Sequence, residues 1–186
     1  RIIGGLAFVC INRTAPGRIL HTEYGLIKIG EYKRPVSPRL RRICEIFNAS
    51  KVPCQMLENL AAGRWEKLVW NVPFNGLGAA LQLATDRIVN NPQGVELVRN
   101  IMHEIVAIAR AEGVELPEDV IEQNIRKTQT MGAYRSSMQI DQEMGRPIEL
   151  ESIIAAPLAT AHRHRISAPY LLMLYQLLCI VAPNQP

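Results

Sequence analysis

The feature that most constrains this chain is a helical period in its apolar residues, which continues with short breaks from about residue 59 onward. The clearest example follows Asn91-Pro92, an N-cap with proline at the first helical position, and it ends at Gly113. Its apolar stripe consists of Val95, Val98, Ile101, Met102, Ile105 and Ile108. Further helices are expected at Pro117–Thr130, Ser136–Gly145, Leu150–His164 and Pro169–Ile180. We therefore predict a mainly α fold, with a helical domain over residues 58–186.

The preceding residues, 1–57, follow a different pattern. Three short β-prone runs, Leu6–Ile11, Arg18–His21 and Leu26–Ile29, surround the turn at Pro16-Gly17 and predict a β-meander. A helix is expected from Ser37 to Asn48, followed by an extended piece at Val52–Leu57. A few short strands cannot bury both faces of a sheet alone. We therefore expect residues 1–57 to be the end of a larger sheet domain.

Composition restricts the class of protein. With 186 residues, 48% apolar and 20% charged, the chain can fill a core. A net charge of +4 is weak support for nucleic acid, and Arg39, Arg41 and Arg42 are interpreted as a solvated helix face, with phosphate binding as the alternative. The apolar run Ala168–Val181 is too short for a bilayer span, which needs about 20 residues. The sequence thus favours a protein without nucleic-acid or membrane partners.

The four cysteines, Cys10, Cys44, Cys54 and Cys179, lack C-x-x-C spacing and have apolar neighbours. That pattern is typical of small buried side chains in a reducing compartment. The same spacing does not suggest a metal site. No signal peptide is apparent, so we expect a cytoplasmic location.

Polar residues recur within the helical stretch Trp65–Asn75. Lys67, Asn71 and Asn75 stand four residues apart and share one helix face, while Pro73 predicts a kink beside them. Spacing alone leaves a plain surface stripe open. Asparagine is a poor helix former for such a surface, however, which favours a functional row.

A second polar group lies in Ser136–Glu149. Ser136 followed by Gln139 is typical of a capping box, and Gly145 of a helix C-terminus. That explanation leaves Ser137, Asp141 and Glu149 without a role.

Both groups match a known family. Lys67-x-x-x-Asn71-x-x-x-Asn75 and Ser137-Met138-x-x-Asp141-x-x-x-Gly145-Arg146-x-x-Glu149 resemble the C-terminal signature of the ketopantoate reductase (2-dehydropantoate 2-reductase) family. Three pieces of the first part are similar to the end of that family's Rossmann domain: Gly4–Phe8, Asn12-Arg13-x-x-Pro16-Gly17, and His21-Thr22 through Gly30-Glu31. The resemblance implies a helical domain of the 6-phosphogluconate dehydrogenase C-terminal type, preceded by the last β-strands of an incomplete Rossmann domain, with substrate in the cleft between them.

The resemblance also implies a reaction and its residues. The reaction is the NADPH-dependent reduction of a 2-keto acid to a 2-hydroxy acid, with ketopantoate to pantoate as the first candidate, within pantothenate and coenzyme A biosynthesis. Lys67 would protonate the carbonyl oxygen, and Glu149 would contact the substrate and the region of the lysine. Asn71, Asn75 and Ser137 would hold the hydroxyl and carboxylate groups of the substrate. For Asp141, a structural hydrogen bond or ion pair and a role in supporting the site both remain open.

Several departures limit the resemblance. Tyr134 stands where ketopantoate-specific members often carry asparagine, and Ile148–Glu151 and Ala155–Pro157 also differ from the family's pattern. They touch the substrate side, so another 2-keto acid is an alternative substrate. A helical interaction or nucleic-acid-binding module is an alternative of a different class.

The dinucleotide fingerprint G-x-G-x-x-G does not follow any strand of this chain, so the cofactor-binding residues are unknown. We interpret Gly76-Leu-Gly78 as helix packing and His162-Arg-His164 as solvated residues at a helix end. The 186 residues alone are expected to be inactive and to bind NADPH weakly. Exposed strand edges make a homodimer plausible.

Overall fold

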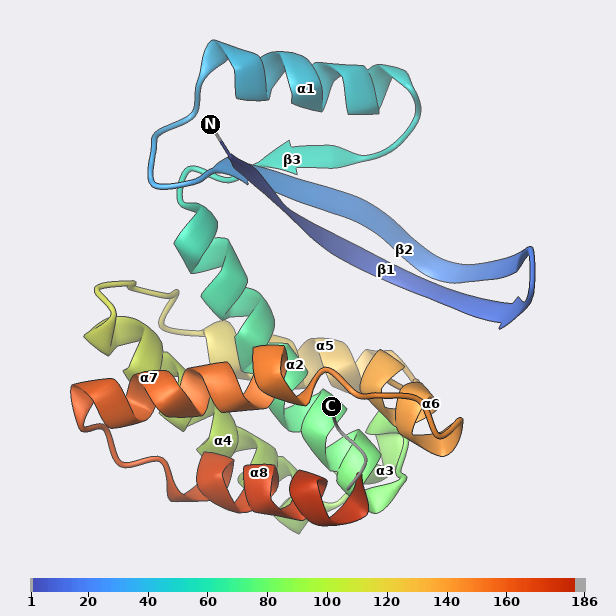
Figure 1. The fold of residues 1–186 in the computed structure, drawn as a ribbon, viewed down its shortest axis with the longest axis vertical. Coiled ribbons are helices and arrows are strands. Elements are labelled where there is room, and N and C mark those ends of the chain that lie inside the picture. The colour runs from blue at the N-terminus through green and yellow to red at the C-terminus, as the bar shows by residue number, and fades with distance from the viewer. Residues whose placement is uncertain (1, 183–186) are drawn as a thin grey trace. The chain divides into compact units, whose positions relative to one another are not determined.

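The computed structural model describes residues 2–182, apart from the side chains of Asn12, Thr22 and Glu23, on which parts of the expected N-terminal motifs fall. It divides into two compact units, Arg1–Arg64 and Trp65–Pro186, and helix α2 (Leu60–Leu81) passes from the first into the second (Figure 1). The prediction of a mainly α fold with a small sheet at the start is confirmed.

The first unit contains a three-stranded sheet in the order β1-β2-β3. Strands β1 (Ile3–Ala15) and β2 (Arg18–Glu31) form a long antiparallel hairpin, and β3 (Cys54–Met56) pairs in parallel with β2. The predicted β-meander is therefore wrong, because two of its runs belong to the single strand β2. Tyr24 and Gly25 have φ values of 64° and 140°, and the pairing register shifts nearby. Such irregularities bend a strand without ending it.

Two glycines allow a helix to approach the hairpin closely. Gly4 and Gly30 are paired across β1 and β2. A Cβ on Gly4 would lie 2.5 Å from Leu60 Cδ2, and one on Gly30 would lie 3.0 Å from Leu60 Cβ. The first turn of α2 thus packs on the strand backbones at a position where a side chain would not fit.

Helix α1 (Pro38–Ala49) covers the sheet as expected from the sequence. Ser37 caps it by accepting a hydrogen bond from the Leu40 amide at 3.1 Å. Its buried residues Leu40 and Cys44 join Ile29 and Cys54 in a small core. Arg41 and Arg42 are exposed, which confirms the solvated face for these two residues.

Arg39 differs from its two neighbours, because its guanidinium pairs with the buried Glu31 at 2.7 Å. Glu31 also accepts a hydrogen bond from the Ser37 hydroxyl. Both hydrogen bonds lower the pKa of Glu31, and the bond from Ser37 has the larger effect.

The second unit is helical. After α2 come α3 (Thr85–Val89), α4 (Pro92–Ala111), α5 (Val120–Thr130), α6 (Ser137–Glu143), a π-helical turn η1 (Glu151–Ala155), α7 (Ala156–His164) and α8 (Pro169–Val181). Most expected helices are confirmed. Helix α5 begins three residues after Pro117, and α3 was not predicted although Thr85-Asp86 is a usual helix start.

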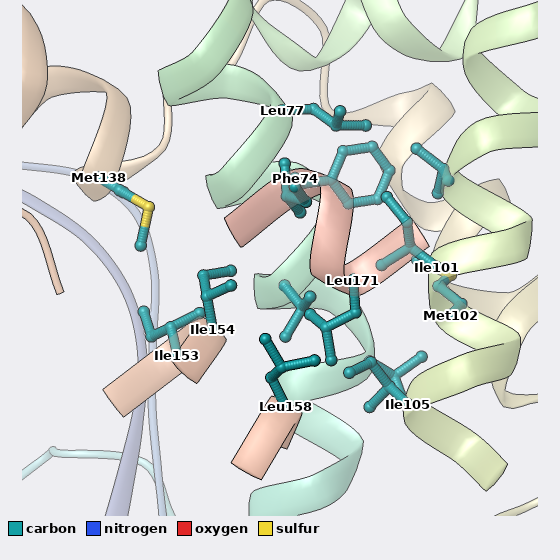
Figure 2. Close-up of a cluster of buried hydrophobic side chains, with 14 of the residues drawn as sticks. Phe74, Leu77, Ile101, Met102, Ile105, Met138, Ile153, Ile154, Leu158 and Leu171 are labelled. Atoms are coloured by element: carbon teal, nitrogen blue, oxygen red, sulfur yellow. The ribbon is translucent and has the colours of Figure 1, made fainter. Parts of the chain in front are cut away.

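Helix α4 provides the centre of the core and contacts α3, α5, α7 and α8. From Val98 onward its apolar stripe is fully buried, and it packs with Phe74, Leu158 and Leu171 (Figure 2). A Cβ on Gly76 would lie 2.6 Å from Leu174 Cδ2, so helix packing explains this glycine as predicted.

The π-helical turn continues directly into α7 and lies just before Pro157. Proline has no N–H for the carbonyl four residues earlier, and its ring crowds that carbonyl. A wider turn makes room for the ring, so Pro157 gives a local reason for η1.

Two carboxylates connect distant helices. Glu104 on α4 accepts hydrogen bonds from the amides of Tyr170 and Leu171 at 2.9 and 2.8 Å, and thereby caps α8. Glu112 at the end of α4 pairs with Arg163 at 2.8 Å and with His164 at 2.5 Å. His162 and His164 are exposed at the end of α7, as expected for solvated residues at a helix end, and His164 in addition pairs with Glu112.

Within residues 2–182, no group of three or more His, Cys, Asp or Glu side chains could hold a metal ion. Over the same range no helix is both long and apolar enough to cross a membrane.

Candidate functional site

The candidate site begins with the polar row of α2. Lys67 and Asn71 are half-buried, and Asn75 is only 3% exposed. Helix α2 continues through Pro73, whose missing N–H leaves the carbonyl of Val69 without its usual helical donor. A solvated surface stripe would leave asparagine exposed to water, so the burial of Asn75 argues against that alternative.

The C-terminal end of the row meets helix α6. Gly78 continues the same face of α2, and a Cβ there would lie 3.4 Å from Ser136 Oγ and from Gln139 Oε1. Ser136 caps α6 by accepting from the Gln139 amide at 3.3 Å. Ser137, the first residue of α6, is therefore close to the end of the row, and it is exposed.

The predicted capping box is only half formed. The side-chain amide of Gln139 donates to Glu143 at 3.0 Å, and its buried Oε1 has no partner among the described residues. Gly145, with φ of 65°, follows the end of the helix as expected for a left-handed C-terminal residue.

The N-terminal end of the row meets Glu149. Burial lowers the pKa of the Lys67 ammonium, and the Glu149 carboxylate partly offsets this effect by raising the pKa. The two groups therefore lie within electrostatic reach of each other in the same unit. From Lys67 to Gly78 the helix rises about 16 Å. Residues 136–149 therefore approach the row at both of its ends, at Gly78 and at Lys67.

Asp141 has a structural partner. Its carboxylate pairs with the guanidinium of Arg146 at 2.6 Å, and the Arg146 amide donates to its backbone carbonyl at 2.8 Å. This pair holds the turn between Ser137 and Glu149. Of the two alternatives for Asp141, the structure contains the ion pair.

Sequence reasoning missed an aromatic group beside the row. Trp70 lies one turn after Lys67, and its ring centroid is 5.1 Å from that of Phe74 and 6.1 Å from that of Tyr134. The indole N–H of Trp70 donates to the Thr128 hydroxyl at 2.9 Å. The signal for Trp70 was its spacing from Lys67 and Phe74, but Thr128 and Tyr134 are 58 and more residues away and have no local signature.

Chemically, the arrangement combines a proton donor with neutral hydrogen-bonding groups. A half-buried ammonium with a lowered pKa releases its proton more readily than an exposed lysine. Amide and hydroxyl groups beside it can donate to a carboxylate and accept from a hydroxyl. A dinucleotide cradle is a different matter: no strand in residues 2–182 leads into a helix through a G-x-G-x-x-G turn.

Comparisons with known proteins identify the family of this chain. Residues 59–181 match the family "Ketopantoate reductase PanE/ApbA C terminal". A 2-dehydropantoate 2-reductase of Nostoc sp. is 37% identical over 179 residues, which is 94% of this chain and 56% of the relative.

Two crystal structures of 2-dehydropantoate 2-reductases have the same fold. The protein from Methylococcus capsulatus is 38% identical with a TM-score of 0.90, over 98% of this chain and 58% of that one. The protein from Geobacter metallireducens GS-15 is 40% identical with a TM-score of 0.91, over 95% of this chain and 59% of that one. This chain thus spans less than two thirds of these relatives' length. The family match covers the helical unit and the two motifs of the site, and this chain belongs to the ketopantoate reductase family.

Proposed function

We propose that these 186 residues contain the catalytic and substrate-binding part of an NADPH-dependent reductase that converts a 2-keto acid to a 2-hydroxy acid. Ketopantoate, which would give pantoate, is the first substrate to test. The observation that carries the proposal is the half-buried Lys67, whose pKa Glu149 influences, on a polar row that ends at Gly78 beside Ser136, the residue before Ser137.

Lys67 is the proposed proton donor. When bound, a nicotinamide cofactor would supply a hydride to the keto carbon, and the carbonyl oxygen of the substrate would gain negative charge. The ammonium of Lys67 stabilises that charge and transfers one proton to the oxygen, so the product is the neutral alcohol. The lowered pKa, which is caused by burial, favours this transfer, and Glu149 partly offsets the lowering because its carboxylate favours the charged ammonium.

The remaining groups are proposed to orient the substrate. Asn71 and Asn75 present amides along α2, and Ser137 presents a hydroxyl from the first turn of α6. We propose that they hold the carboxylate and hydroxyl groups of the acid. Asp141 acts less directly, because its pairing with Arg146 keeps the chain between Ser137 and Glu149 in place.

The cofactor-binding residues belong to a different part of the proposed enzyme. We propose that residues 1–57 are the end of a Rossmann domain, and that its pyrophosphate cradle lies in the part of the relatives' chains that this chain does not match. The preference for NADPH rests on the family alone, since the 2′-phosphate is recognised within that same domain.

A chimera tests the proposal. It joins the N-terminal residues of the Nostoc relative, up to its matched region, to this chain, and ketopantoate-dependent NADPH oxidation is measured. We expect activity in the chimera but not in the 186 residues alone. Lys67→Ala should lower kcat about 100-fold or more, the usual scale of general acid catalysis, with unchanged NADPH affinity.

The matched control is Lys127→Ala, which removes an exposed lysine from α5. Its kcat should equal that of the parent chimera. If Lys67→Ala retained full turnover, or lost only cofactor binding, the role of Lys67 would be contradicted.

The second candidate is reduction of another 2-keto acid by the same site. Tyr134 favours it, because an aromatic ring packed near Trp70 occupies the position of the family's asparagine. A panel of 2-keto acids with branched, aromatic and hydroxylated side chains, compared by kcat/KM in the chimera, distinguishes the two substrates. The helical interaction or nucleic-acid-binding alternative has less support, because Arg39 is already paired with Glu31.

We also propose a cytoplasmic location and a homodimer. Cys10, Cys44 and Cys54 are buried free thiols, as expected in a reducing compartment, whereas Cys179 is a free thiol that is exposed, so the expected burial is wrong for it. Strand β1 is an outer strand of the described sheet, and we propose that a second copy pairs along it. Sedimentation of the purified chain over a range of concentrations tests the dimer.

A further inference from the structure

The backbone of the loop between α5 and α6 is bonded to the buried Thr85. Thr85, the first residue of α3, is only 2% exposed. Its amide donates to the Tyr134 carbonyl at 2.9 Å, and its hydroxyl donates to the Gly132 carbonyl at 3.0 Å. The same hydroxyl accepts from the Tyr134 amide at 3.2 Å. One threonine thus bonds to three backbone groups of a loop 47 to 49 residues away, and the Tyr134 amide shares its hydrogen with the Gly132 carbonyl at 2.9 Å.

The hydroxyl of Thr85 is needed for two of these bonds. It acts as donor and acceptor at once, a combination that no apolar side chain of the same shape can supply. Gly132 has φ of 70°, in the left-handed region where glycine is favoured, and its carbonyl is the acceptor of the Thr85 hydroxyl. The loop conformation and Thr85 therefore fit each other.

Thr85 also lies shortly after the end of α2, the helix that carries the polar row. Helix α2 ends at Leu81 and α3 begins at Thr85, so only a short link separates them. On the other side, the loop leads from Tyr134 to Ser137 at the start of α6. Thr85 therefore connects the end of the Lys67 helix with the segment that presents Ser137.

A second contact holds the same loop at its ring. Tyr134 packs against Trp70 with an interplanar angle of 53°, and Trp70 is itself fixed by Thr128. The backbone of Tyr134 is thus held by Thr85 and its ring by α2. These two contacts define where the loop lies relative to Lys67.

We propose that Thr85 is a positioning residue for the substrate side of the site: its bonds to Gly132 and Tyr134 set the position of Ser137 and Tyr134 relative to Lys67. The proposal rests on the proposed function of the Lys67 site. It assigns no contact between Thr85 and the substrate. A change at Thr85 should therefore alter substrate binding more than the chemical step.

The test compares Thr85→Val, which keeps the shape and removes the hydroxyl, with Thr85→Ser, which keeps the hydroxyl. In the chimera we expect Thr85→Val to raise KM for the 2-keto acid about tenfold, the equivalent of one to two buried hydrogen bonds, with unchanged KM for NADPH. Thr85→Ser should return KM to within about threefold of the parent. A fall in melting temperature with unchanged KM would show a purely structural role and overturn the proposal.

Thr128→Val is the matched control for the loss of a buried hydroxyl, because Thr128 is also fully buried and both donates and accepts. Its hydroxyl reaches the loop through Trp70, so the KM of this variant should change less than that of Thr85→Val. An equal rise in KM would overturn the specific role of Thr85.

A further measurement does not depend on activity. In the 186-residue chain, hydrogen exchange of the Tyr134 amide and the NMR contact between the Trp70 and Tyr134 rings report on the loop directly. Thr85→Val should speed the exchange and weaken the ring contact, and Thr85→Ser should preserve both. Unchanged exchange of the Tyr134 amide in Thr85→Val would overturn the proposal. Full turnover in Lys67→Ala, by contrast, would refute only the proposed function.

Discussion

The helical unit and the β1–β2 hairpin bury their apolar residues to very different extents. In the helical unit, side chains from α2, α4, α7 and α8 share one core, and those of Phe74, Ile105 and Leu171 are almost completely buried. In the distal part of the hairpin, Ile11, Ile19 and Leu20 are exposed, Ile19 by 71%. Helices with apolar stripes can cover one another within a single chain, whereas two strands cannot cover their own faces.

The small core of the first unit has a corresponding composition. It is built by Ile29, Leu40, Cys44 and Cys54 beneath α1, and two of these four are cysteines. Its stability depends partly on polar bonds, since the Asn48 side chain accepts from the Cys54 amide at 2.9 Å and donates to the Cys54 carbonyl at 3.1 Å. The comparison indicates that the helical unit holds most of the folding free energy of the chain.

The largest expected effect tests this comparison directly. Phe74→Ala should lower the free energy of unfolding by about 3–5 kcal/mol, because it leaves a cavity in the core beside Trp70. Ile19→Ala in the hairpin should change it by less than about 0.5 kcal/mol. Urea unfolding followed by far-UV circular dichroism measures both. Similar losses for the two variants would break the comparison.

A smaller effect is expected at the start of α8. Glu104→Ala should cost about 2–3 kcal/mol, because the amides of Tyr170 and Leu171 lose their acceptors. Burial raises the pKa of Glu104, although the two amide bonds act in the opposite direction. The folded state therefore binds more protons between the unfolded and the folded pKa, and this contribution to stability is lost as pH rises through that interval.

Glu104→Gln separates the contribution of the hydrogen bonds from that of the titration, because glutamine keeps the shape and one acceptor oxygen but does not titrate. Its free energy of unfolding, measured in urea from pH 4 to 8, should lack the decline that Glu104 causes in the parent chain. A decline of equal size in Glu104→Gln would show that another group is responsible.

The third variant is expected to raise the free energy of unfolding, and it changes Lys67 in the candidate site. Burial lowers the pKa of Lys67, so the folded state disfavours its charge at neutral pH. Lys67→Met should therefore raise the free energy of unfolding by about 0.5–1 kcal/mol. The gain should shrink as pH rises through the interval from the lowered to the ordinary lysine pKa, where the unfolded state binds more protons. A loss of stability at neutral pH would contradict the burial of the ammonium.

The smallest expected effect is a change in the pKa of Lys67, and it tests how close Glu149 is to this lysine. Glu149→Gln should lower the pKa of Lys67 further, because Glu149 is the group that raises it. Glu151→Gln is the control: it removes a carboxylate two residues away, whose electrostatic effect is on Tyr175. NMR titration of the lysine side chains in both variants decides, and equal shifts would place the two carboxylates at similar distances from Lys67.

The local part of this fold was predictable from the sequence. Asn91-Pro92 starts α4, Ser136 caps α6 and Gly145 follows its end, because capping and proline geometry depend on neighbours within a few residues. The row of Lys67, Asn71 and Asn75 followed from helical spacing, and the family resemblance connected it with Ser137 and Glu149. The sequence also predicted exposed strands at the start of the chain.

Only the tertiary structure decided which distant groups meet. Glu149 acts on Lys67, Glu104 caps α8, and Thr85 holds the loop of Tyr134, all across more than 40 residues. None of these pairs has a spacing that a local pattern could reveal. The merging of two predicted runs into β2 had the same cause, since the bulge near Gly25 is stabilised by pairing with β1. Short-range geometry depends on adjacent residues, but the choice among long-range partners depends on how the complete set of helices and strands packs.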